Sequence, residues 1–172
     1  MKRKITILVI IVISFLIQST IFPVFQFASV GPNLMLIVTA SFGFMRGKKE
    51  GMMVGFTAGL FFDLFWGTTL GFNMLLFTVT GYINGSFQRL YYDEDIKLPL
   101  VLIGISEFFY GTVTCFCIYV LRGDFDFMSH LFNIIIPELV YTILATLVLY
   151  QIILHINKRL EAEEQRSASK FV

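Results

Sequence analysis

The stretch LPLVLIGISEFFYGTVTCFCIYVL, residues 98–121, decides the fold. Its apolar residues run on without alternation, and Glu107 is its one acidic or basic residue. A run of this length allows a helix to cross the roughly 30 Å hydrocarbon core of a bilayer. A transmembrane β-barrel would instead show alternating segments of about ten residues. The stretch therefore predicts a membrane-spanning helix.

The rest of the chain has the same character. Of its 172 residues, 56% are hydrophobic, 16% are aromatic and 15% are charged, whereas a soluble chain is about 25% charged. This composition leaves too little polar surface for a water-facing exterior. Six spans of about 20 residues would use about 120 residues and leave no room for an extramembrane domain. We therefore expect an all-α integral membrane protein.

Six spans are predicted, and they form a single transmembrane domain over residues 1–156. The turn at 67–70 makes the third and fourth spans a close helical hairpin, and Pro32 sets the start of the second span. A charged tail, residues 157–172, is expected to fray. The spans cover residues 5–23, 32–45, 50–66, 71–88, 98–121 and 131–155.

The first span also has features of a secretory signal peptide, because Met-Lys-Arg-Lys precedes a short apolar run, residues 5–17. No convincing small-x-small cleavage site follows, since residues 28–30 form a poor one. We therefore expect an uncleaved first helix.

The positive charges indicate the orientation. If the N-terminus is cytoplasmic, the outer segments carry Arg122 alone, and all other Lys and Arg residues lie inside. This bias predicts cytoplasmic termini and an even number of spans. The inner residues are Lys2, Arg3, Lys4, Arg46, Lys48, Lys49, Arg89, Lys97, Lys158, Arg159, Arg166 and Lys170.

Small residues recur every four positions along the third span. Steps of four advance about 400° around a helix, so these residues form one stripe on its surface. Such a stripe lets another helix backbone approach closely. It fits packing inside the bundle, or a face that binds a partner. The stripe and its continuation comprise Gly51, Gly55, Gly59, Asp63, Gly67 and Gly71, and Gly81 and Gly85 repeat the spacing in the fourth span.

Three acids fall within spans, where an ionisable group costs about 2.5–3.5 kcal/mol. Asp63 lies about 4.5 Å below the outer interface, close enough to reach water. Glu138 directly follows Pro137, which is expected to kink the sixth span. Glu107 lies roughly 14 Å deep, the nearest to the midplane.

Glu107 has no Lys or Arg partner within any span. It is therefore protonated, faces a wet cavity, or bonds to Ser106, Tyr110, Thr112 or another protein. A neutral acid in a packing contact and a functional acid both fit the sequence.

The sequence contains no recognisable catalytic, cofactor-binding or metal-binding constellation, which predicts a non-enzymatic protein. Cys115 and Cys117 point about 200° apart on a helix, and His130 and His155 lie at opposite ends of the sixth span. No phosphate-binding, nucleophile-elbow or metalloprotease motif is present. A net charge of +1 with no basic face argues against nucleic-acid binding.

Three features together resemble the MreD family of bacterial rod shape-determining membrane proteins. They are Pro32-Asn33-Leu34, the basic turn at 46–49, and the pattern Gly55-Phe56-x-x-Gly59-x-x-x-Asp63-x-x-x-Gly67-x-x-Leu70-Gly71. The specific part of the likeness covers residues 32–85.

The resemblance implies a location in the bacterial cytoplasmic (inner) membrane and a bundle similar to the substrate-binding subunits of energy-coupling-factor transporters. It also implies association with a bitopic MreC-like protein and, through it, with MreB-like, RodA-like and penicillin-binding proteins. The alternative is a substrate-binding subunit of a vitamin-type transporter, because three membrane acids without basic partners suit a cationic substrate.

Overall fold

The computed structural model describes residues 2–20, 31–67, 69–90, 96–117 and 131–168. These residues contain six α-helices and no strand, which confirms the prediction of an all-α protein. The helices are α1 (Lys2–Thr20), α2 (Leu34–Arg46), α3 (Lys48–Phe65), α4 (Phe72–Ser86), α5 (Lys97–Cys115) and α7 (Ile136–Ala168), with a 3-10 turn η2 (Gln88–Leu90) and a π-helical turn η4 (Leu131–Ile135).

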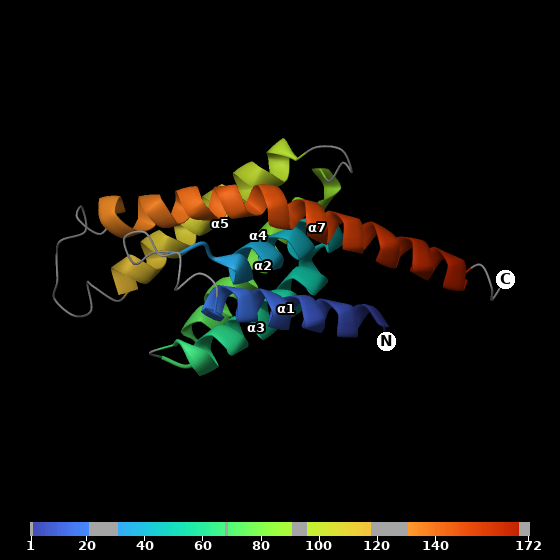
Figure 1. The fold of residues 1–172 in the computed structure, drawn as a ribbon, viewed down its shortest axis with the longest axis horizontal. Coiled ribbons are helices and arrows are strands. Elements are labelled where there is room, and N and C mark those ends of the chain that lie inside the picture. The colour runs from blue at the N-terminus through green and yellow to red at the C-terminus, as the bar shows by residue number, and fades with distance from the viewer. Residues whose placement is uncertain (1, 21–30, 68, 91–95, 118–130, 169–172) are drawn as a thin grey trace.

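The short helix α2 is the centre of the bundle. It contacts each of the other five α-helices, and in Figure 1 it lies between α7 and α1. Its residues 34–45 are all buried. A helix that is apolar on every side is stable only when it is surrounded, so its sequence matches this position.

The close turn between α2 and α3 depends on one residue, Gly47. Its φ angle of 92° lies in the left-handed region that favours glycine. The Gly47 N–H donates to the Gly43 carbonyl, and the Gly47 carbonyl accepts from the Gly51 N–H, so the residue closes one helix and opens the next.

The other helices pack around α2 in two pairs and a single helix. The most extensive pairing joins α3 to α4 as the predicted hairpin, and α5 pairs with α7. Helix α1 packs on α2 and α3, and Phe15 holds its outer end against the rings of Phe61, Phe65 and Trp66. The first turn of α1 and the last turn of α7 lie at the same end of the molecule (Figure 1).

Three helical segments of the described chain are long and apolar enough to cross a membrane, namely residues 3–20, 97–115 and 131–166. Helix α2 is apolar but has only 13 residues. The model therefore has the features of a helical membrane protein, while the count of six spans stays a prediction.

The helix ends differ from the expected spans mainly in the last helix. Residues 157–168, expected to fray, continue α7 as helix. They do so because Asn157 and Glu164 bond to Arg46 of α2, which ties the charged segment to the bundle. The expected ends at residues 21–23 and 118–121 lie outside the described residues.

The distortion expected at Pro137 takes the form of a widened turn. The five residues of η4 are π-helical and α7 begins directly after them. Pro137 has no N–H to donate, and a π-helical turn before it accommodates the missing hydrogen bond.

Candidate functional site

The glycine stripe of α3 faces the backbone of α4. A Cβ atom added to Gly55 would lie 2.6 Å from the carbonyl carbon of Phe77, and one added to Gly59 would lie 2.7 Å from the Met74 nitrogen. A Cβ on Gly51 would lie 2.9 Å from the carbonyl carbon of Gly81. The two backbones therefore touch along this face, and α4 fills the surface that the stripe offers.

The remaining glycines lie at the two ends of the hairpin. Gly85 packs against the turn between α2 and α3, and Gly67 and Gly71 lie in the turn between α3 and α4. At the inner end, a Cβ on Gly85 would lie 2.6 Å from the carbonyl carbon of Gly47. At the outer end, a Cβ on Gly67 would lie 2.7 Å from the Asp63 Cα atom, and Gly71 has a φ angle of 99°. All the predicted small residues thus lie within or beside the α3–α4 hairpin.

Asp63 caps the start of α4. Its Oδ2 accepts hydrogen bonds from the Gly71 N–H at 2.8 Å and the Met74 N–H at 3.0 Å. Its Oδ1 accepts from the Asn73 backbone N–H at 3.1 Å and from the Asn73 side-chain amide at 2.9 Å. Four donors therefore surround one carboxylate at the positive end of a helix.

The expectation that Asp63 reaches water is wrong. The residue is only 4% exposed, because the turn after α3 folds the first residues of α4 back over the carboxylate. The same cluster extends to α5, where the Tyr110 hydroxyl donates to Asn73 Oδ1 at 2.8 Å. The α3–α4 hairpin is thereby joined to α5 by polar groups within the bundle.

A second polar cluster surrounds the first turn of α2. This helix is 13 residues long, about 20 Å, which is shorter than the roughly 30 Å hydrocarbon core. Its C-terminal Arg46 lies at the charged end of the bundle, and its first turn, residues 34–37, is buried among the other helices. The free N–H groups of that first turn therefore need partners from the protein.

Those partners come from the cap residue before α2 and from two other helices. The Leu36 N–H donates to Asn33 Oδ1 at 3.2 Å, and the Met35 N–H donates to Gln18 Oε1 of α1 at 3.2 Å. The Asn33 N–H donates to the Thr142 hydroxyl of α7 at 3.1 Å. Gln18 and Thr142 are not among the residues predicted from the sequence, although each is a polar residue in an apolar run, which is the signal that marks such partners.

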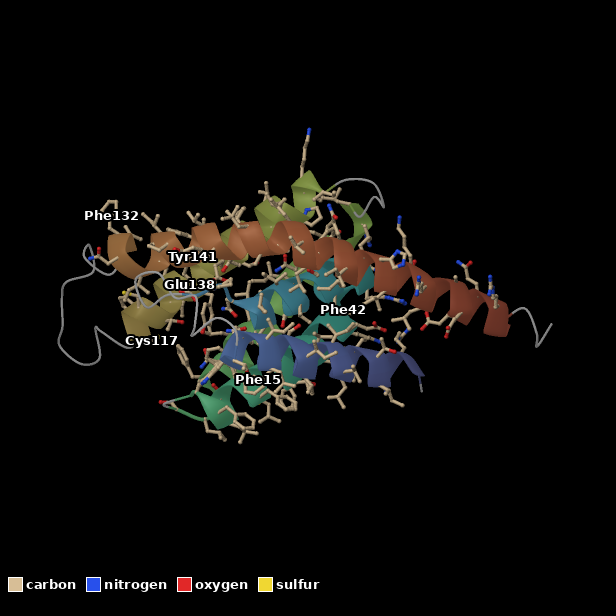
Figure 2. All side chains as sticks on the ribbon, viewed as in Figure 1. Phe15, Phe42, Cys117, Phe132, Glu138 and Tyr141 are labelled. Atoms are coloured by element: carbon tan, nitrogen blue, oxygen red, sulfur yellow. The ribbon has the colours of Figure 1, made fainter. Side chains whose placement is uncertain are left out.

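Glu107 of α5 lies beside this helix start and is only 2% exposed. Its carboxyl group lies against the Glu138 carboxyl group of α7 and the Asn33 side chain. Neither oxygen of Glu107 has a well-aligned hydrogen-bond partner among the described residues. Figure 2 shows Glu138 on the side of α7 that faces the other helices.

The three partners suggested for Glu107 by its neighbours in sequence bond elsewhere. The Ser106 hydroxyl accepts from the Asn84 side chain, and the Thr112 hydroxyl donates to the Phe108 carbonyl. Tyr110 donates to Asn73, as described above. The side chains near Glu107 along α5 are thus engaged with other groups, and the side chain beside Glu107 is Glu138 of α7.

Charged side chains form ion pairs at the end of the bundle where α1 begins and α2 ends. Arg46 is 10% exposed and bonds through Nη1 to Glu164 Oε2 at 3.0 Å. Arg3 of α1 bonds to Glu164 Oε1 at 2.9 Å and pairs with Glu50 of α3. Partial burial disfavours ionisation of Glu164, but its hydrogen bonds and charge contacts with Arg46 and Arg3 outweigh it and lower the pKa of this carboxyl.

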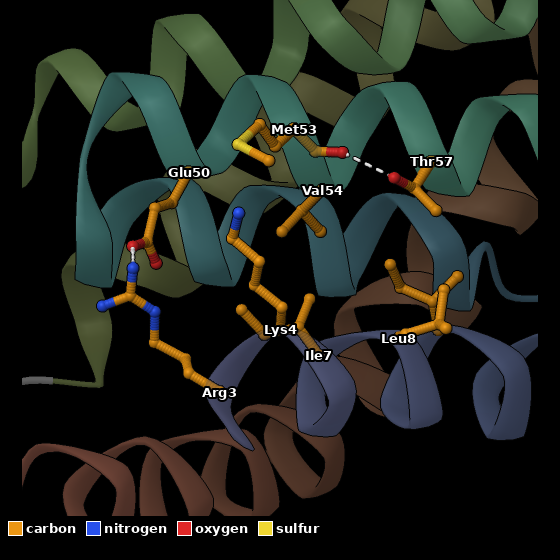
Figure 3. A pocket seen from close by; sticks show the side chains of 9 residues that line it. Arg3, Lys4, Ile7, Leu8, Glu50, Met53, Val54 and Thr57 are labelled. Carbon is orange, nitrogen blue, oxygen red and sulfur yellow. Dashed lines mark hydrogen bonds and ion pairs between the residues drawn. The ribbon is translucent and has the colours of Figure 1, made fainter. Parts of the chain in front are cut away.

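A cavity of about 150 Å³ opens beside these charges, between α1 and α3 (Figure 3). Its lining is mainly apolar, with Arg3, Lys4 and Glu50 at one end. Its one hydroxyl group, on Thr57, donates to the Met53 carbonyl at 2.8 Å. The cavity therefore holds no nucleophile and base in contact.

A second hollow, of about 590 Å³, lies on the inner face where α2 and α3 meet the end of α4. Its lining includes Arg46, Lys48, Lys49 and Arg89. Four basic side chains therefore lie around this hollow.

The described residues hold no group of three or more metal-ligating side chains. Cys115 and Cys117 are free thiols. His130 lies outside the described residues. The polar groups found instead cap helices and join them to one another, which defines a helical membrane protein whose polar interior is built for packing.

The family comparison agrees with this class. The model for the rod shape-determining protein MreD matches residues 1–159, so the chain belongs to the MreD family. No curated protein and no solved structure gives a significant match. The likeness to energy-coupling-factor subunits therefore stays a prediction.

Proposed function

We propose that the chain is a non-enzymatic scaffold of the bacterial cell-elongation complex, located in the cytoplasmic (inner) membrane. In this role it binds a bitopic MreC-like protein and, through it, MreB-like, RodA-like and penicillin-binding proteins. The observation that carries the proposal is the match to the MreD family over residues 1–159. The bundle supports it, because its polar groups hold helices together and leave no catalytic arrangement in the described part.

The partner's transmembrane helix docks on the lipid-facing surface. Large apolar side chains are exposed on every long helix, among them Leu16 of α1, Phe56 of α3, Ile105 of α5 and Val148 of α7. The glycine stripe is a poor candidate for this contact, because α4 already lies against it. Association in lipid then depends on side-chain packing and interhelical hydrogen bonds at another face.

The transporter alternative has weaker support. It needs acids that are free to hold a cationic substrate, and Asp63 is fully engaged by four donors at the start of α4. Glu107 and Glu138 face each other, and neither lines one of the two cavities described above. The scaffold is therefore the function that we propose.

The test is co-purification of the full chain with the MreC-like protein of the same organism, combined with photo-crosslinking in cells. A crosslinking amino acid is placed in turn at Leu16, Phe56, Ile105 and Val148, and at buried Phe42 as the matched control. We expect capture of the partner and crosslinks from one contiguous face, with none from position 42. Failure of the wild-type chain to capture an MreC-like protein would overturn the scaffold proposal.

A further inference from the structure

Two carboxyl groups face each other inside the bundle without a basic partner. Glu107 projects from α5 and Glu138 from α7, and the two groups meet beside Asn33 at the start of α2. Among the described residues, no Lys or Arg side chain acts on either of them. The other titratable groups that face the region are Tyr110, one turn along α5, and Asp63 beyond it.

An ionised carboxylate only accepts hydrogen bonds, so two ionised carboxylates in contact cannot bond to each other. Both oxygens of Glu107 are buried, and neither has a well-aligned donor among the described residues. A proton between the two groups turns one of them into a donor and gives each group one hydrogen bond. Without that proton, two negative charges would lie together in a poorly solvated interior, which is costly.

The surroundings favour one proton over two. The N-terminus of α2 carries a partial positive charge and lies beside the pair, and it stabilises one negative charge there. Asp63 lies beyond Tyr110, and its own charge is stabilised there by four hydrogen-bond donors.

We propose that Glu107 and Glu138 form a proton-binding site that holds a single proton between them and thereby ties α5 to α7 at the start of α2. The ligand is the proton itself, and the site is independent of the partner contacts proposed above. Loss of the proton leaves two like charges in contact and weakens the α5–α7 pairing.

Infrared spectroscopy of the full chain in nanodiscs tests the proposal directly, because a protonated carboxyl group has its own C=O stretch. We expect the wild-type protein at neutral pH to show a signal equal to one protonated carboxyl per chain. Glu107→Gln and Glu138→Gln should each abolish it, since the remaining acid then ionises and accepts from the new amide. Glu163→Gln, at an exposed position of α7, is the matched control and should leave the signal unchanged.

Two results would overturn the proposal. If each single variant keeps a signal, the two acids are protonated independently. If the wild-type protein shows no signal, or if sodium chloride removes it while choline chloride does not, the site holds no proton or holds a metal cation instead. The wild-type amplitude decides between one and two protons even if a variant fails to fold.

Thermal unfolding supplies a second readout. A proton held in the folded state and released on unfolding makes stability fall as the pH rises. We expect the wild-type melting temperature to fall on going from neutral to alkaline pH, and the double variant Glu107→Gln/Glu138→Gln to lack that fall. Equal slopes in the two proteins would contradict a shared proton.

Discussion

Replacing Gly55 by Ala tests whether the α3–α4 contact limits the stability of the bundle. The added Cβ atom would lie 2.6 Å from the carbonyl carbon of Phe77 and 2.9 Å from the Thr78 nitrogen. Ordinary Cβ contacts lie between 3.4 and 4 Å. Both obstacles are backbone atoms, so no side chain can turn away, and the helices must separate by close to 1 Å.

The magnitude follows from that separation. Overpacking of this kind typically costs about 1–3 kcal/mol, and separation also weakens dispersion contacts along the hairpin. For a chain of this size, 1 kcal/mol lowers the melting temperature by about 2–4 °C, so the steric cost alone corresponds to a fall of roughly 2–12 °C. The higher helix propensity of Ala offsets part of this, by up to about 1 kcal/mol.

The matched control is Gly104→Ala in α5. A Cβ atom there meets Ile143 Cδ1 at 3.7 Å, an ordinary contact, so the variant gains the same helix propensity without a clash. Thermal unfolding of both variants in one detergent isolates the steric cost as their difference. If Gly55→Ala is as stable as Gly104→Ala, the two backbones do not touch and the packing argument fails.

Three further predictions concern the outer cap, the inner charges and the topology. Asp63→Asn replaces one of the two accepting oxygens by an amide nitrogen, so some of the four donors lose their acceptor. We expect a loss of about 1–3 kcal/mol in the free energy of unfolding, and an unchanged free energy would contradict the cap. The lowered pKa of Glu164 means that its contribution is present above the unfolded pKa of about 4.3 and is lost as the pH falls further. The stability difference between wild type and Glu164→Gln should therefore shrink in acid, and a constant difference would refute this. Reporter fusions after residues 49, 95 and 172 should report cytoplasm and one near 126 the outside, whereas an external C-terminus would exclude six spans.

The sequence predicts the helices well, because continuous apolar runs and the glycines between them act locally. The hairpin of α3 and α4 follows from the small-residue spacing at Gly55 and Gly59 together with the short turn. The sequence does not show that the glycine stripe packs inside the bundle, because the same spacing fits a second helix of this chain or a helix of a partner. Only the arrangement in space shows that α4 occupies it.

The polar contacts are less predictable, since they join residues far apart in the chain. Glu107 and Glu138 each stand out in the sequence, yet nothing local indicates that they meet, because their contact depends on how α5 packs on α7. The sequence correctly predicts that Asp63 lies near the end of α3. Its hydrogen bonds could not be predicted, because most of the donors are backbone N–H groups, which a pattern of side chains does not reveal. The helical tail depends likewise on the distant Arg46.

The shortness of α2 explains why polar groups gather where they do. Because its N-terminus is buried among the other helices, α1 contributes Gln18 and α7 contributes Thr142 to satisfy it, and the Glu107–Glu138 pair lies beside its positive end. The α3–α4 hairpin, in contrast, is held by direct contact between two backbones, and separating them by about 1 Å costs about 1–3 kcal/mol. If the proton is shared as proposed, the contacts of α5 and α7 with α2 are hydrogen bonds that can be exchanged one at a time, whereas a shift of α4 against α3 meets backbone atoms along the hairpin. We expect any change of shape on partner binding to move α5 and α7 against a hairpin that stays rigid.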